Sequence, residues 1–140
     1  MSDVAAAITE VRARIAAAAR RAGREPYAVR LVAATKTVPA ERVADAVALG
    51  VTDVGENRAQ ELLAKADTLA AMAPSTQADV CWHFLGRLQR NKVPRLAGRV
   101  TWWQSVDREA LGVAIARHAP GAQVLVEVNL ADEPQKGGCA

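Results

Sequence analysis

The feature that most constrains the fold is a regular alternation of short apolar runs with segments of helical periodicity. The apolar runs cover residues 29–35, 51–55, 81–86, 100–104 and 123–130, and helices are expected at 3–22, 39–49, 58–72, 89–97 and 108–118. The first run is almost continuously apolar, which is typical of a strand covered on both faces. The alternation therefore predicts an α/β fold with a parallel sheet and right-handed crossovers.

The composition indicates one soluble globular domain over residues 1–140, with 51% hydrophobic and 24% charged residues. The net charge of +3 is spread along the chain without a basic run interleaved with aromatics, so we expect no nucleic-acid partner. The N-terminus has early acidic residues and no apolar segment, which predicts neither a signal peptide nor a membrane span. Cys81 and Cys139 match no metal or redox spacing, which favours a reduced, cytoplasmic protein.

Helix periodicity and capping residues complete the predicted scaffold. The helix at 3–22 has one apolar stripe, and its arginines are expected to form a solvated face. Asn57 is a good N-cap, with Gln60 as its capping-box partner, and Asp107 is expected to cap the helix at 108–118. The residues expected to point inward from the next helices are Val43, Ala46, Val47, Leu62, Ala66, Leu69, Leu111, Ala114 and Ile115.

Polar side chains follow most of the predicted strands at their carboxyl ends. Because the strands of a parallel sheet end at one edge, we expect these groups to lie together there. Ligands of such sheets bind at that edge, so the sequence predicts a binding site. The groups are Lys36, Glu56, Asn57, the Gly86–Arg87 turn and Asn129.

Lys36 ends the run LVAATKT, residues 31–37, and is the first candidate for chemistry. A neutral lysine amine can attack an aldehyde or ketone and form a Schiff base. The carboxyl end of a buried strand suits that role. It equally suits an ordinary lysine that reaches into solvent, so position alone leaves both interpretations open.

The segment WHFLGRLQRNK, residues 82–92, offers further candidates. On the strand, His83 shares a face with Leu85, so it could contact a cofactor ring or phosphate, or could be a hydrogen-bonded core residue. Gly86 allows a tight exit from the strand. The basic cluster that follows suits an anion or is simply solvated, and consists of Arg87, Arg90 and Lys92.

Several common motifs are absent from the sequence. Neither the dinucleotide-binding GxGxxG pattern nor the P-loop pattern occurs. No His, Cys and carboxylate spacing suggests a metal, and no serine has a recognisable nucleophile context. We therefore predict no metal site and assign no catalytic residue.

Five stretches occur together in a distinctive order and spacing. They are LVAATKTVPAERV (31–43), VGENRAQEL (54–62), WHFLGRLQRNK (82–92), SVD (105–107) and VLVEVNLADEPQKGGC (124–139). This set resembles the pyridoxal-phosphate homeostasis protein family, the YggS-like proteins with an alanine-racemase-type barrel. The match covers nearly the whole chain.

The resemblance implies a TIM-barrel fold like the N-terminal domain of alanine racemase, with about five of eight strands present. It implies that Lys36 forms the Schiff base with pyridoxal 5'-phosphate and that Asn57 and His83 lie near the cofactor. Members of the family bind the cofactor and keep vitamin B6 and amino- and keto-acid pools in balance, without an established catalytic turnover. The implied partners are the cofactor and pyridoxal-phosphate-dependent apoenzymes.

The main departure from the family pattern is length. An eight-stranded barrel needs about 250 residues, so five strands predict a truncated or partial chain. In the resemblance, the missing part holds the last three strands, the phosphate-binding loops and an arginine near the pyridine nitrogen. We therefore expect the 140 residues alone to bind the cofactor weakly.

The sequence is also compatible with two other functions. A racemase-like enzyme on the same cofactor would need a second acid/base, usually a tyrosine, and the only tyrosine, Tyr27, precedes the first strand. A fragment that binds no cofactor would act only through protein contacts. We favour a carrier over an enzyme.

Overall fold

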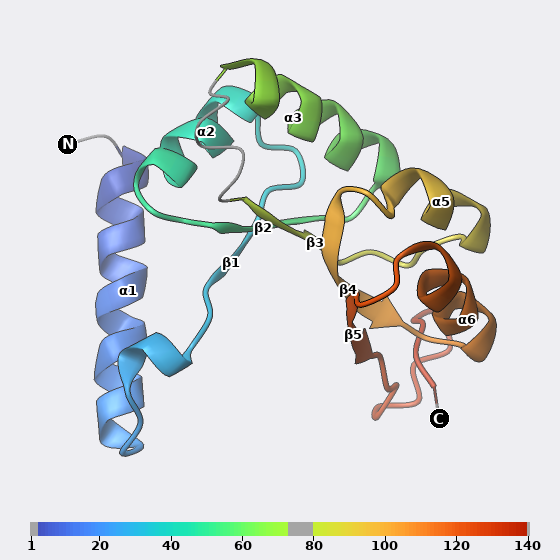
Figure 1. Cartoon of the computed structure of the whole chain (residues 1–140). Coiled ribbons are helices and arrows are strands. Elements are labelled where there is room, and N and C mark those ends of the chain that lie inside the picture. Colours follow the sequence, from blue (N-terminus) through green and yellow to red (C-terminus); the bar gives the residue numbers. More distant parts are fainter. Residues whose placement is uncertain (1–2, 73–79, 140) are drawn as a thin grey trace.

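The computed structural model describes residues 3–72 and 80–139 (Figure 1). Its strands are β1 (Val32–Ala34), β2 (Asp53–Glu56), β3 (Cys81–Phe84), β4 (Val100–Val106) and β5 (Gln123–Val126). Its α-helices are α1 (Asp3–Arg21), α2 (Ala40–Ala48), α3 (Ala59–Met72), α5 (Val93–Leu96) and α6 (Glu109–His118). Short 3-10 helices, η1 (Pro26–Ala28) and η2 (Arg90–Lys92), precede β1 and α5.

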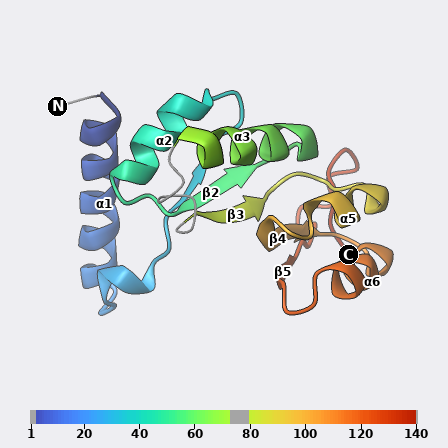
Figure 2. The ribbon, with the colours of Figure 1, turned by 45° about the horizontal axis from the view of Figure 1, so that its top comes forward.

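The strands form one sheet in the order β1-β2-β3-β4-β5, and every neighbouring pair is parallel. Because each crossover steps to the next strand, crossovers of one hand place the helices on a single face. Figures 1 and 2 show α2, α3, α5 and α6 following one another around the outside of a curved row of strands. The predicted fold of parallel β/α units is confirmed. The opposite side of the sheet is covered by no helix of the described residues, and we call it the inner face.

The core lies between the sheet and these helices. The strands turn alternate residues toward the helices, and Val54, Trp82, Phe84 and Trp103 are at most 4% exposed there. Burying a large apolar side chain contributes about 1.5–3 kcal/mol, so this packing fixes which residues are left for the inner face. The periodicity correctly predicted the buried helix residues Val43, Val47, Leu62, Ala66, Leu69, Leu111 and Ile115.

β1 and β5 are shorter than the sequence predicts. Pro26 begins η1, and the strand expected over 29–35 is reduced to Val32–Ala34. β5, expected over 123–130, ends at Val126, and Val128 instead forms an isolated bridge with Cys139. Both are edge strands of the sheet, so each forms backbone hydrogen bonds with only one neighbouring strand.

Two predicted helix caps are wrong. α3 begins at Ala59, and the Asn57 side chain has no hydrogen-bond partner among the residues that the structure describes. α6 begins after Arg108 without a side-chain cap, because Asp107 pairs instead with Arg87 and Arg108. An ion pair across two loops thus replaces the expected local bond.

α1 lies against α2 and η1 at one side of the sheet (Figure 1). Its predicted apolar stripe is only partly covered, and Val11 remains 36% exposed. Arg12 does not belong to a merely solvated face, because its guanidinium donates to the carbonyls of Leu49 at 3.0 Å and Gly50 at 2.7 Å. These bonds satisfy carbonyls at the end of α2. No helix in the described ranges is long and apolar enough to cross a membrane.

Candidate functional site

Lys36 lies in the turn that follows β1, at the carboxyl edge of the sheet. The chain turns through Thr37, which has a φ of 65°. The Val38 amide donates to the Thr35 carbonyl at 2.9 Å and closes the turn. The turn leaves the Lys36 side chain exposed, so its amine can meet a ligand at this edge.

Thr35, the residue before Lys36, is held by a buried group that we call the rear cluster: Thr35, Glu56 and Lys65. The Thr35 hydroxyl donates to Glu56 Oε1 at 2.6 Å, and Lys65 Nζ donates to the same oxygen at 2.5 Å. Lys65 Nζ also donates to the Thr35 carbonyl at 2.6 Å. The rear cluster therefore ties the end of β1 to β2 and α3 from the helix side.

The rear cluster is closed to solvent. The Glu56 side chain is 0% exposed and that of Lys65 is 12% exposed. Glu56 Oε2 is buried without a hydrogen-bond partner, so this carboxylate depends on the contacts of Oε1. The Lys65 amine is committed to the cluster, whereas the Lys36 amine has no hydrogen-bond or ion-pair partner within residues 3–72 and 80–139.

Asn57 follows β2 at the same edge and is half-buried. A Cβ atom at Gly86 would lie 2.2 Å from the Asn57 carbonyl oxygen, so the close approach of the two backbones requires glycine. Asn57 also lines a hollow of about 490 Å³ together with Arg58, Arg87 and Lys92. The predicted basic cluster therefore contributes two of its members to a basic rim beside Asn57.

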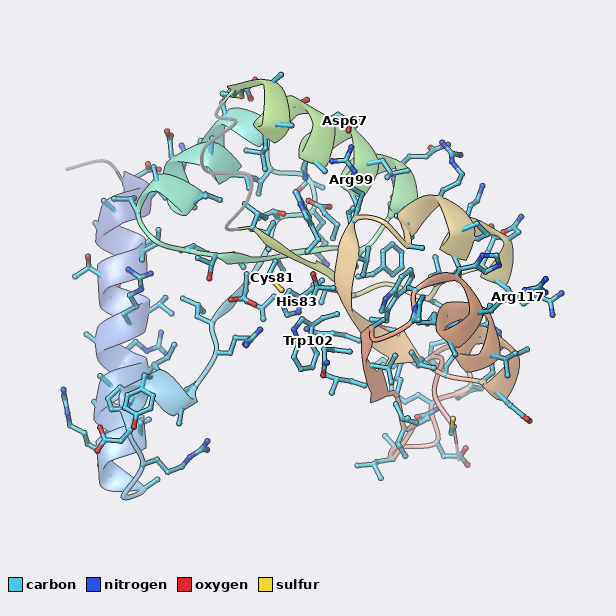
Figure 3. The ribbon with its side chains drawn as sticks, viewed as in Figure 1. Asp67, Cys81, His83, Arg99, Trp102 and Arg117 are labelled. Carbon is cyan, nitrogen blue, oxygen red and sulfur yellow. The ribbon has the colours of Figure 1, made fainter. Side chains whose placement is uncertain are left out.

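His83 lies on the inner face and is 1% exposed. Its Nε2 is 2.8 Å from Asp53 Oδ1 and its Nδ1 is 2.7 Å from Gln104 Nε2. With the amide nitrogen donating to Nδ1, the Nε2 proton is donated to Asp53. The ring stacks on Trp102 with centroids 5.9 Å apart, and Figure 3 shows the two side chains together. His83 is thus a fully hydrogen-bonded residue of the inner face.

Asp53 connects this group to a cation. Arg30 NH1 lies 3.0 Å from Asp53 Oδ1, and the guanidinium lies over the Trp102 ring, 5.3 Å from its centroid. Burial raises the pKa of Asp53, but hydrogen bonds from His83 and Thr52 and the charge of Arg30 outweigh it. The pKa of Asp53 is therefore lowered, and its carboxylate form is stabilised.

Cys81 lies beside Asp53 and His83, and we call these three residues the inner-face cluster. Their ligand atoms, one oxygen, one sulfur and one nitrogen, lie within 4.8 Å of one another. Burial raises the pKa of the Cys81 thiol. The cluster is the densest group of metal-type donors in the described ranges.

The register of the sheet relates the three predicted site residues. Ala34 pairs with Gly55, and Gly55 pairs with His83, so these residues lie level with one another. Lys36 is two residues beyond Ala34, and Asn57 is two residues beyond Gly55. Two residues of a strand span about 6.6 Å. The structure therefore brings Lys36 and Asn57 to the edge, while His83 lies one step below on the inner face.

Sequence reasoning missed the partners of these residues. A parallel register is not written in the sequence, so nothing placed Cys81 opposite Asp53 or Gln104 beside His83. The sequence offered one signal, because Asp53 and Gln104 are polar residues within predicted strands. Lys65 lies in α3, the helix that follows Glu56. The apolar periodicity of this helix does not distinguish Lys65 from a lysine exposed to solvent.

The fold and this edge define the class as a parallel β/α protein with an exposed lysine at the carboxyl edge of its sheet. No family model matches the chain. The pyridoxal phosphate homeostasis protein of Pseudomonas aeruginosa is 40% identical over 144 residues, covering 100% of this chain and 60% of the relative. The protein of the same name from Escherichia coli K12 is 34% identical over 142 residues, covering 99% of this chain and 59% of the relative.

Solved structures with a similar fold include two at 33% and 35% sequence identity. PipY of Synechococcus elongatus with pyridoxal phosphate bound superposes with a TM-score of 0.70 at 33% identity, over 91% of this chain and 57% of PipY. An unknown protein from Bifidobacterium adolescentis superposes with a TM-score of 0.85 at 35% identity, over 100% of this chain and 62% of that protein.

The chain is therefore a relative of the pyridoxal phosphate homeostasis proteins, and the predicted resemblance is confirmed. It spans about three fifths of the length of the curated relatives it matches.

Proposed function

We propose that this chain holds pyridoxal 5'-phosphate as a Schiff base on Lys36 and serves vitamin B6 and amino- and keto-acid homeostasis. The observation that carries the proposal is the exposed Lys36 amine at the carboxyl edge of a parallel sheet. The name of the Pseudomonas relative and the cofactor in the Synechococcus structure support it.

The side chains at this edge suit the aldehyde of the cofactor. Bound pyridoxal phosphate supplies an electrophilic carbon to which a lysine amine can add. The chain has four lysines, and Lys65 and Lys136 form ion pairs with Glu56 and Glu133. Lys36 and Lys92 have no ion-pair partner in the described part of the chain. Of these two, Lys36 directly follows a strand end that the rear cluster fixes.

We further propose that Asn57 and His83 belong to the cofactor site. The unpaired amide of Asn57 offers donors and an acceptor at the level of Lys36. Both ring nitrogens of His83 are engaged, so its contribution would be to hold Gln104 and Trp102 in place on the inner face.

A carrier fits the chain better than a racemase-like enzyme. Such an enzyme needs a second acid/base at the reacting carbon. Tyr27 is the only tyrosine, is 86% exposed, and lies in η1 before β1, at the opposite end of that strand from Lys36. Incubation of the loaded protein with L-alanine should give no D-alanine above a protein-free control, and its formation would contradict the carrier function.

Reversible attachment would allow the cofactor to pass to other proteins. We propose pyridoxal-phosphate-dependent apoenzymes as partners and the cytoplasm as the compartment, where the free Cys81 and Cys139 would stay reduced.

A titration with pyridoxal phosphate tests the proposed attachment. The chain should develop the visible absorbance of a lysine Schiff base, and Lys36→Ala should abolish the saturable part of it. Lys136→Ala is the matched control, because Lys136 is an exposed lysine paired with Glu133, and it should titrate like the original chain. Saturable absorbance that persists in Lys36→Ala would overturn the proposal.

A further inference from the structure

We propose that the inner-face cluster of Asp53, Cys81 and His83 is a binding site for a thiophilic divalent metal ion such as Zn²⁺. Its carboxylate oxygen, thiol sulfur and ring nitrogen lie within 4.8 Å of one another. Thiolate, imidazole and carboxylate are the donors that Zn²⁺ takes in proteins, and three protein ligands leave a fourth position for water or a substrate.

Two neighbouring strands place the three donors without the help of a loop. Asp53 of β2 is paired directly with Cys81 of β3, and His83 is two residues along β3 on the same face. Neighbouring strands are about 4.8 Å apart and alternate residues of a strand about 6.6 Å apart. The side chains therefore start from a small triangle of fixed backbone, which lowers the entropic cost of bringing them onto one ion.

The donors are also held in place by neighbouring side chains. Thr52 donates to Asp53 Oδ2 at 3.0 Å, and Trp102 stacks on the His83 ring at a 4° interplanar angle. Gln104 lies 2.7 Å from His83 Nδ1. A metal-bound imidazole donates its second N–H to an oxygen, and rotation of the Gln104 amide presents Oε1 in place of Nε2. That exchange frees His83 Nε2 to bind the ion.

Arg30 is the group that competes with a metal ion. Its guanidinium lies 3.0 Å from Asp53 Oδ1, but its side chain is 55% exposed and can turn into solvent. The 2.8 Å hydrogen bond between His83 and Asp53 is then replaced by an ion that both residues bind. Metal affinity should therefore rise when the charge of Arg30 is removed.

The site is separate from Lys36. His83 lies level with Ala34, and Lys36 is two residues beyond that level. His83 is also proposed for the cofactor site, so Co²⁺ binding is measured without pyridoxal phosphate, and failure of the metal site then stays distinguishable from failure of the Lys36 attachment.

Co²⁺ is a suitable probe, because thiolate ligation gives an ultraviolet charge-transfer band and tetrahedral ligation gives visible bands. The tag-free full chain, reduced and freed of metal, should bind one Co²⁺ with both features, and Zn²⁺ should displace it. Cys81→Ser should remove the charge-transfer band, and His83→Asn should weaken binding at least tenfold. Circular dichroism of the metal-free variants confirms that they are folded.

The chain supplies its own matched controls, because Cys139 and His118 are its other cysteine and its other histidine. Cys139→Ser and His118→Asn should bind Co²⁺ like the original chain. Absence of a thiolate band from the original chain, or a band that survives in Cys81→Ser, would overturn the proposal.

Arg30→Gln provides a second test that leaves all three ligands in place. Removing an exposed ion pair of ordinary strength should tighten Co²⁺ binding roughly two- to fivefold. Weaker or unchanged binding in this variant would contradict the assignment of Asp53 as a ligand.

Discussion

The rear cluster and the inner-face cluster both set a carboxylate of β2 against a cation, but on opposite faces of the sheet. Glu56 and Lys65 lie between the sheet and the helices, and their side chains are 0% and 12% exposed. The side chains of Asp53 and Arg30 are 12% and 55% exposed. Because Asp53 and Glu56 are three residues apart, the period of the strand alone sends them to different faces.

This difference in exposure separates a structural group of side chains from one that can take a ligand. The rear cluster is covered by α3, and its Lys65 donates a hydrogen bond to the carbonyl of Thr35 at the end of β1. Each member therefore depends on the others. The inner-face cluster is paired through Asp53 with Arg30, an exposed cation that can leave, and its donors lie on the inner face. A carboxylate paired with a cation therefore braces the Lys36 turn on one face of the sheet and is free to exchange its partner on the other.

The largest effect is expected from Lys65→Met. It leaves Glu56 buried with the Thr35 hydroxyl as its remaining partner, and breaking a buried pair from one side costs about 3–5 kcal/mol. Denaturant unfolding measures the loss. Arg99→Ala is the control, since it breaks the exposed pair with Asp67 that also anchors α3 (Figure 3) and should cost about 1 kcal/mol or less. Equal losses would show that the rear cluster is no more structural than a surface pair.

His83→Phe should have an intermediate effect. The ring and its stacking on Trp102 are kept, while Asp53 and Gln104 each lose one hydrogen bond. Asp53 keeps Arg30 and Thr52, so we expect a loss of about 1–3 kcal/mol in the free energy of unfolding. A loss as large as that of Lys65→Met would remove the contrast between the clusters.

The smallest effect on stability is expected from Arg30→Gln. The Arg30 side chain is 55% exposed, and pairs of this kind contribute about 0.2–1 kcal/mol. Thermal unfolding at low and high salt measures this contribution, which should shrink as salt screens the pair. A salt-independent loss would show that Arg30 acts through packing on Trp102 rather than through its charge.

The sequence was informative where the structure depends on the periodicity of apolar residues or on where a strand or helix ends. The order of strands and helices, the buried faces of α2, α3 and α6, and the placement of Lys36 at a strand end follow from local patterns. Capping was predicted less well, because Asp107 had a stronger partner in Arg87, which lies on another loop. The sequence does not reveal such long-range competition.

The candidate site shows the same division. Lys36 and Asn57 could be placed at the carboxyl edge of the sheet because each follows an apolar run, and position along the chain is visible in the sequence; their role in binding stays a prediction. Asp53 and Cys81 were not connected, because their pairing depends on the register between β2 and β3. The interior partners of a site are therefore the part that only the folded chain reveals.

The measurement that tests the account most directly is peptide mapping after borohydride reduction of the chain with pyridoxal phosphate. Lys36, Lys65, Lys92 and Lys136 compete in one sample, so the labels on the other three lysines serve as internal controls. We expect a reduced pyridoxyl group on Lys36 well above Lys92 and Lys136, little on the buried Lys65, and loss of the Lys36 label alone in Lys36→Ala. Equal labelling of Lys36, Lys92 and Lys136, or preferential labelling of Lys65, would contradict it.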